Sequence, residues 1–173
     1  MASGTSPNGK LCLVMVGSSE SEQHPGQLEL RKTGSNPAIG SLDVDSYALF
    51  PSVAAPDQTA CFWAPDSKHF ALMVRDSKRT WSVGIYEANG SMRKLPIPNL
   101  TEFALKTLGQ NSTFRWSREM PLRWSDATHI QIKLSGDYGT APDVKEYSGE
   151  ISISIMDGKI TLKEPFKTEK EEG

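Results

Sequence analysis

The segment from Phe62 to Leu95, FWAPDSKHFALMVRDSKRTWSVGIYEANGSMRKL, decides the fold of this chain. The run APDSK at 64–68 predicts a tight turn, because proline fixes φ and aspartate and serine favour turns. The apolar run at 70–74 predicts a strand with Phe70, Leu72 and Val74 on one face, and the alternation of apolar residues over 81–85 predicts a second strand. Asn89-Gly90 favours a type I′ hairpin turn. The segment therefore predicts three strands joined by short connections.

Two weaker copies of this pattern lie before and after it. Pro7-Asn8-Gly9-Lys10 matches Pro65-Asp66-Ser67-Lys68, which begins 58 residues later. Trp124 matches Trp63 when one residue is deleted where the proline would be, and His129 then matches His69. A period near sixty residues with several strands per repeat indicates propeller-like blades rather than a solenoid of short turns.

The third copy ends in a further predicted hairpin. The run EISISI at 150–155 alternates strictly, Asp157-Gly158 predicts a second type I′ turn, and KITLKE at 159–164 is the returning strand.

The central segment resembles the blade repeat of TolB-like β-propellers, which are related to the WD40-like class. Those blades read Trp-Ser-Pro-Asp-Gly-Lys, then an apolar strand, then a strand ending in an aromatic residue with a glycine four positions later, and finally a leucine. The residues at matching places are Trp63, Pro65, Asp66, Lys68, Tyr86, Gly90 and Leu95. The resemblance implies a fold and carries almost no information about activity, because these residues are the ones that turns and hairpins require.

We therefore predict an all-β fold of antiparallel meanders of propeller-blade type. Three copies are too few for a ring, since propellers have at least four blades. The alternatives are a sandwich, which we favour, and a partial propeller completed by a second chain. One domain is expected over 1–166, followed by a charged tail at 167–173. Its repeat units are placed at about 5–45, 60–97 and 121–164.

One short helix is expected near 100–108. Asn99 is a suitable N-cap, Glu102 stands three residues later as in a capping box, and Gly109 is a suitable C-terminal stop. Leu100 and Ala104 fall on one apolar face, so we expect the helix to cover the core.

Length and composition exclude some classes. The 173 residues are 37% hydrophobic and 23% charged, which is ordinary for a soluble globular domain. The net charge of −2 argues against a protein that binds nucleic acid by neutralising phosphates. No apolar run is long enough to span a membrane. No signal peptide is visible, so the sequence indicates the cytoplasm as it stands, or the periplasm or secretion if a leader was removed.

The reactive side chains form no recognisable motif. Cys12 and Cys61 lie in apolar runs and are expected as buried thiols, with a disulfide between them as the alternative. His24, His69 and His129 lack metal-ligand spacing, and the last two share a repeat position, which favours a structural role. We therefore predict no metal site, no cofactor and no catalytic residue, and whether the chain is an enzyme stays open, with the balance against it.

Two features carry candidate binding residues. In FRWSREMPLRW at 114–124, arginines and aromatic residues interleave, a combination that binds anionic or stacked ligands and is enriched at interfaces. Two core tryptophans with arginine stems beside them are the alternative. The second feature is the expected loop 135–148, which is either a binding loop or a plain hairpin connection. The candidate residues are Arg115, Trp116, Arg118, Arg123, Asp137, Tyr138, Asp143 and Tyr147.

The function that these patterns favour is a non-enzymatic binding module that presents loops from a β scaffold to a protein partner. The alternative is a carbohydrate-binding protein or a hydrolase that uses the aromatic and acidic residues of 135–148. A homodimer is compatible with both.

Overall fold

The computed structural model describes the chain in segments. These are residues 4–16, 26–44, 61–75, 77, 79–110, 114–140 and 142–170. Within them the protein is all-β apart from the single helix α1 (Leu100–Thr107), so the predicted fold class is confirmed.

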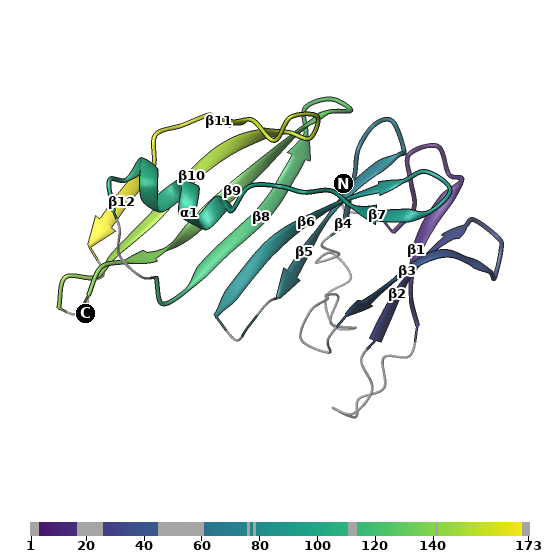
Figure 1. The fold of residues 1–173 in the computed structure, drawn as a ribbon, viewed down its shortest axis with the longest axis horizontal. Helices are drawn as coiled ribbons and strands as arrows, with labels where there is room; N and C mark the ends of the chain where they lie inside the picture. The colour runs from purple at the N-terminus through teal and green to yellow at the C-terminus, as the bar shows by residue number, and fades with distance from the viewer. Residues whose placement is uncertain are drawn as a thin grey trace.

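The strands form two sheets (Figure 1). The first is an antiparallel sheet of three strands, β1 (Leu11–Val16), β2 (Gly26–Lys32) and β3 (Ala38–Val44). The second has nine strands, which are β4 (Cys61–Trp63), β5 (His69–Arg75), β6 (Thr80–Ala88), β7 (Met92–Lys94), β8 (Ser117–Trp124), β9 (His129–Tyr138), β10 (Lys145–Ser154), β11 (Ile160–Leu162) and β12 (Lys167–Lys170). Its main path runs β11-β10-β9-β8-β6-β5-β4, with β12 beside β10 and β7 beside β6.

The nine-stranded sheet consists of two antiparallel meanders, β4–β7 and β8–β11, that are joined at one point. The join is a short parallel pairing of β6 with β8, in which Thr80 lies opposite Ser117 and Trp81 opposite Arg118. Beyond these two pairs β6 continues beside β7, while β8 continues beside β9. The sheet therefore forks between β6 and β8.

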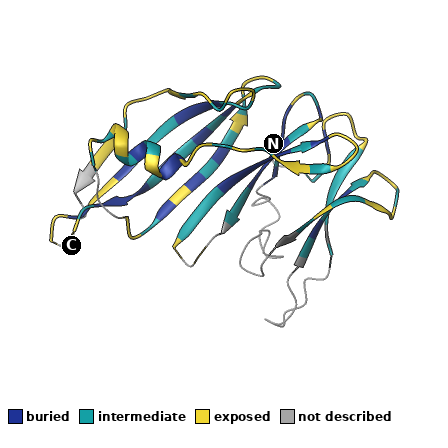
Figure 2. Ribbon diagram, in the orientation of Figure 1, coloured by how far each residue is buried: buried dark blue, intermediate teal, exposed yellow. Residues whose placement is uncertain are grey.

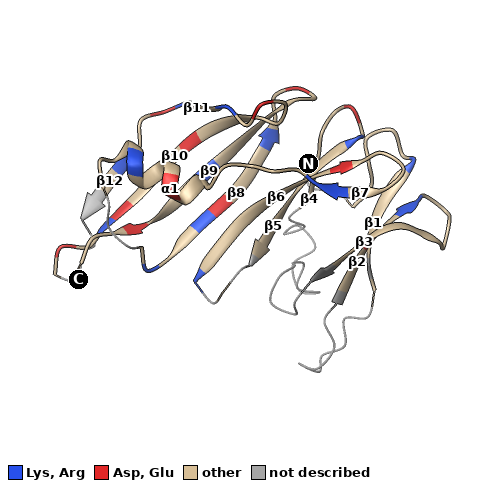
Figure 3. Ribbon diagram, viewed as in Figure 1, with Lys and Arg blue, Asp and Glu red and all other residues tan. Residues whose placement is uncertain are grey.

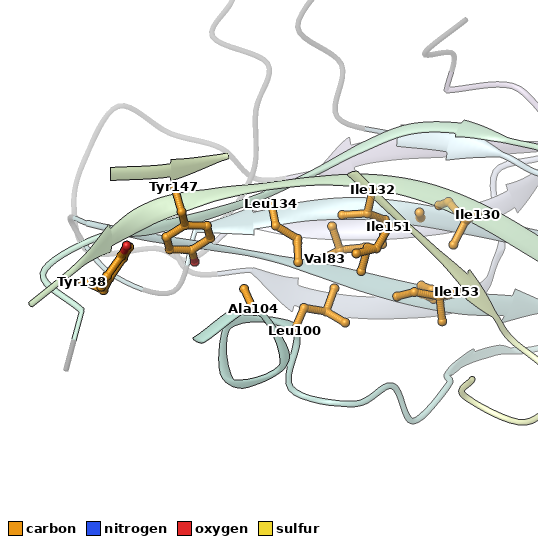
Figure 4. Close-up of a cluster of buried hydrophobic side chains, with 12 residues drawn as sticks. Val83, Leu100, Ala104, Ile130, Ile132, Leu134, Tyr138, Tyr147, Ile151 and Ile153 are labelled. Atoms are coloured by element: carbon orange, nitrogen blue, oxygen red, sulfur yellow. The ribbon is translucent and has the colours of Figure 1, made fainter. Parts of the chain in front are cut away.

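Two apolar cores lie on the two sides of the β4–β7 meander. The first contains Val83 and Ile85 together with Leu100 of α1 and the isoleucines of β9 and β10 (Figure 4). The second contains Phe70 and Tyr86, packed against Leu28 and Leu30 of the three-stranded sheet. Because alternate residues of a strand point to opposite sides, β5 and β6 contribute to both cores. Figure 2 shows the buried positions along these central strands.

The helix forms as the sequence predicts. The Oδ1 of Asn99 accepts the backbone N–H of Glu102 at 3.0 Å, which satisfies one of the free donors of the first turn. Leu100 and Ala104 are buried in the first core, and Gly109 follows the helix with a φ of +69°. The prediction that α1 covers the core is confirmed.

The predicted turn type, I′, is wrong for both hairpins. A type I′ turn needs a positive φ at both central residues, but in each hairpin only the glycine, Gly90 or Gly158, has one. Ala88 pairs with Met92, so the first hairpin has a three-residue loop rather than a two-residue one. In the second, the N–H of Gly158 donates to the C=O of Ser154, which closes a wider turn.

Two further expectations are corrected by strand pairing. Most of 135–148 is strand, because β9 and β10 pair from Tyr138 opposite Lys145 onwards and leave only 139–144 as the connection. Residues 167–170, expected in a tail, form β12 beside β10. The candidate binding segment 114–124 includes β8, which pairs with β9. His24 and the residues between the first two predicted repeat units, 45–60, lie outside the described residues.

Candidate functional site

Each of the three repeat units begins with a turn that has the same hydrogen-bond pattern. In each turn a backbone N–H donates to the C=O of the residue where the next strand starts. These bonds join Ser6 to Leu11, Ala64 to His69 and Ser125 to His129, at 2.9, 2.8 and 2.8 Å. The three turns lie at the positions that the sequence alignment matches, and the third is one residue shorter than the other two.

A short side chain closes each turn from inside. In each turn the Oδ1 of this side chain accepts a hydrogen bond from the backbone N–H two residues later. The pairs are Asn8 with Lys10, Asp66 with Lys68 and Asp126 with Thr128, at 3.0, 2.8 and 2.7 Å. Hydrogen bonds lower the pKa of Asp126 to about 2. The bond from the N–H of Thr128 has the largest effect, followed by those from the side chains of His129 and Thr128. A carboxylate that is ionised at all ordinary pH values keeps this turn closed.

The two repeat-related histidines support these turns. The Nδ1 of His69 lies 2.7 Å from Oδ2 of Asp66, and the Nδ1 of His129 lies 3.0 Å from Oδ2 of Asp126. The same contact therefore occurs in two units, which supports a structural role for both histidines.

Residues in or just before the three turns line one pocket, which we call the three-turn pocket. The N-terminal end of the described chain lies beside β4 at this place (Figure 1). The pocket has a volume of about 580 Å³. Its lining comes from all three units and consists of Thr5, Ser6, Pro7, Phe62, Trp63, Pro65, Leu122, Arg123 and Trp124.

The two tryptophans of the three-turn pocket occupy equivalent positions but make different contacts. The Nε1–H of Trp124 donates to the backbone C=O of Phe62 at 2.8 Å, which ties the third unit to the second. The indole of Trp63 is 9% exposed and packs against Phe70 with 4.9 Å between ring centroids. Its Nε1–H is buried and has no hydrogen-bond partner among the described residues.

Arg123 is exposed and is held at the pocket by a second polar residue. Its Nε donates to Oε1 of Gln131 at 2.7 Å, and the Nε2 of Gln131 in turn donates to Oγ of Ser125 at 3.1 Å. Of the eight residues predicted as binding residues, Arg123 is the one that lines the three-turn pocket.

Three of the other predicted residues form a hydrogen-bonded cluster around the buried carboxylate of Asp137, at the start of β8. Asp137 is 0% exposed, and its carboxylate accepts the N–H of Arg115 at 2.6 Å, the Nε–H of Arg115 at 2.7 Å and the N–H of Trp116 at 3.0 Å. Burial opposes ionisation of Asp137, but the donors from Trp116 and Arg115 outweigh it and hold its pKa below the ordinary value. The contacts are those of a structural anchor.

The remaining predicted residues do not form a binding surface. Tyr138 and Tyr147 are 7% and 3% exposed and belong to the first core, so the expectation of exposed aromatic residues here is wrong. Burial raises the pKa of Tyr147, with the charges of Glu119 and Asp137 adding to the effect. Asp143 is exposed in the short turn before β10, and the guanidinium of Arg118 lies 5.7 Å from the ring centroid of Trp81.

The fork between β6 and β8 produces a second hollow, which we call the fork groove. It has a volume of about 850 Å³ and is bounded by β6, the connection 94–99 and the start of α1. Glu119, 7% exposed, lies in its wall, and its Oε2 accepts the N–H of Val83 at 2.8 Å. The carboxylate thus supplies the acceptor that a continued β6–β8 pairing would have given. Lys94 and Glu102 also line the groove, so its charges are mixed.

Sequence reasoning missed Phe62 and Trp63 as pocket residues. A signal was present, because Trp63 and Trp124 align between copies and their equivalence predicts that they face a common place. Their proximity to Thr5 and Pro7 depends on how the units stack, which the local pattern does not specify.

Known proteins add nothing to this geometry. Comparison with protein families, with curated proteins and with solved structures finds no match. Within the described residues no group of histidine, cysteine and carboxylate side chains is placed to hold a metal ion. The same residues include no helix with the length and apolarity of a membrane span.

Proposed function

We propose that this chain is a non-enzymatic binding module that engages a partner protein through the three-turn pocket. The observation that carries the proposal is that residues in or just before three equivalent turns line one pocket that contains two tryptophans and an arginine. Tryptophan and arginine dominate the binding energy of protein interfaces, especially where they line a preformed pocket.

The pocket is rigid before a partner arrives. The Trp124–Phe62 hydrogen bond fixes one wall, and the Asn8 N–H donates to Oγ of Ser67 at 3.0 Å and fixes the first turn against the second. A preformed pocket loses less conformational entropy on binding than a mobile loop does.

We further propose that the three units are blades of propeller type. The support is that β5 and β6 give alternate residues to two cores, so the middle unit is covered on both sides. A blade inside a stack has this pattern, whereas each sheet of a two-layer sandwich has one solvated face.

The hydrolase or carbohydrate alternative at 135–148 is not favoured by the arrangement. Tyr138 and Tyr147 are buried, and the Asp137 carboxylate is already bound by Arg115 and Trp116. A sugar that stacks on Trp124 would compete with a protein partner for the three-turn pocket, and a panel of glycans tests for such binding.

The test uses a display library of random peptides and a panel of glycans. Peptides enriched on the wild-type chain are then titrated against Thr5→Trp, which fills the rim of the pocket from an exposed position. We expect at least a tenfold loss of affinity. The matched control is Thr161→Trp on β11, also exposed but outside the pocket lining, which leaves affinity unchanged. Equal binding by Thr5→Trp, or binding of glycans alone, would contradict the proposal.

A further inference from the structure

We infer that the three-turn pocket recognises a carboxylate of the partner polypeptide, held by the guanidinium of Arg123. This inference rests on the proposed function and names the chemical group that the same pocket selects.

The first reason is the charge of the lining. Nine of the described residues line the pocket, and Arg123 is the one charged residue among these nine. The fork groove differs, since Lys94 there is accompanied by Glu102 and Glu119. An arginine with no acidic neighbour in the lining favours an anionic guest, because the guest supplies the opposite charge.

The second reason is the geometry of the Arg123 guanidinium. The bond from its Nε to Gln131 uses one of the five N–H donors and orients the plane of the group. Its two terminal NH2 groups make no hydrogen bond to the described residues. A guanidinium held in this way is suited to a planar, two-oxygen acceptor such as a carboxylate.

The third reason is the apolar wall beside Arg123. The rings of Trp124 and Phe62, with Pro65, line the same pocket, which favours an acidic residue that has an apolar neighbour.

Phosphate groups, including those of nucleic acids and lipids, share the negative charge but not the flat two-oxygen shape. We choose the carboxylate because the pocket contains one arginine and an apolar wall, whereas phosphate sites gather several cationic or backbone donors.

The experiment titrates peptides selected on the wild-type chain, each in matched acidic and amide forms. We expect a Glu→Gln or Asp→Asn change at one position, or amidation of the C-terminus, to weaken binding about tenfold to a hundredfold. The two kinds of change show whether a side chain or the chain end enters the pocket. Peptides that bind equally well in all forms would overturn the inference.

Variants of the protein test the role of the arginine. Arg123→Gln is expected to lower affinity for the acidic form to that of the amide form, while Arg118→Gln, on the same strand but outside the pocket, leaves it unchanged.

The experiments distinguish a failure of the carboxylate inference from a failure of the proposed function. If Thr5→Trp blocks binding but the acidic and amide peptides bind alike, the pocket binds protein without reading a carboxylate. If Thr5→Trp has no effect, the proposed function fails and the carboxylate inference fails with it. Selective binding of phosphorylated peptides over acidic ones would overturn the carboxylate inference alone.

Discussion

The backbone N–H of Asn8 donates to the Oγ of Ser67 at 3.0 Å, so the turn of the first unit is bonded to the turn of the second. Ser67 has a φ of +58°, in the left-handed region, and its equivalent in the first unit, Gly9, has a φ of +69°. A serine thus stands where the backbone favours glycine, and its hydroxyl serves a contact that a glycine cannot make.

Substitutions at Ser67 separate the hydrogen bond from the backbone strain. Ser67→Ala and Ser67→Gly both lose the hydroxyl, but only alanine keeps a Cβ at the positive φ. We expect Ser67→Gly to be more stable than Ser67→Ala by about 1 kcal/mol, the cost of the left-handed conformation for a residue with a Cβ. Urea unfolding of both variants measures the difference. Equal stabilities would show that the turn relaxes.

The contact between the first two turns shows which parts of the fold can be predicted from the sequence. The turn residues, the strands and the helix at Asn99–Gly109 follow from local chemistry, because proline, glycine and capping side chains act within a few residues. The short parallel pairing of β6 with β8 does not, since Thr80 and Ser117 meet only after both meanders have formed.

The candidate site illustrates the same limit. Arg123 was predicted from its aromatic neighbours, but Tyr138 and Tyr147 were assigned to a loop because glycine and proline at 139–142 interrupt the pattern. In the fold, Tyr147 packs directly over Gly136, where an added Cβ would lie 2.8 Å from its ring. A glycine that makes room for an aromatic residue on the next strand resembles a loop glycine in the sequence.

Asp137 is predicted to stabilise the fold in a pH-dependent way. Asp137→Asn removes the charge that the donors of Arg115 and Trp116 bind, so we expect a loss of about 2 kcal/mol at neutral pH. Because the folded-state pKa is lowered, the wild-type advantage is complete above the unfolded value of about 3.9 and is lost as the pH falls through the folded-state pKa.

Chemical denaturation from pH 7 to pH 2 measures this advantage. The wild-type and Asp137→Asn curves are expected to converge on the acid side, whereas Asp143→Asn, at the exposed turn nearby, stays close to wild type throughout. A constant difference between wild type and Asp137→Asn at all pH values would show that the lost contact, rather than the ionisation, is responsible.

The two cysteines are predicted to differ in reactivity. Both are free thiols, so the disulfide considered from the sequence is absent from the structure. Burial raises the pKa of Cys61 to about 12, which leaves almost no thiolate at neutral pH, whereas Cys12 is only partly buried. We expect a thiol reagent at pH 8 to modify one cysteine quickly and the second only on unfolding. Cys12→Ser is expected to remove the fast phase, and a fast phase that remains would contradict the prediction.

The chain is predicted to be a monomer of 19.0 kDa in solution. On β9 and β10, Ile132 and Ile151 lie opposite each other in the first core, while the other face pairs Lys133 with Glu150. That outer face continues with glutamine and serine side chains, and acidic and basic residues are interspersed over both sheets (Figure 3). A second chain that completed a ring would have to pack against this polar face, where little apolar surface is available for burial.

Light scattering on a sizing column, repeated over a tenfold range of concentration, measures the mass of the protein in solution. A stable species of twice the monomer mass would contradict the prediction. It would show that another surface, such as the edge of β1 or β11, joins two copies.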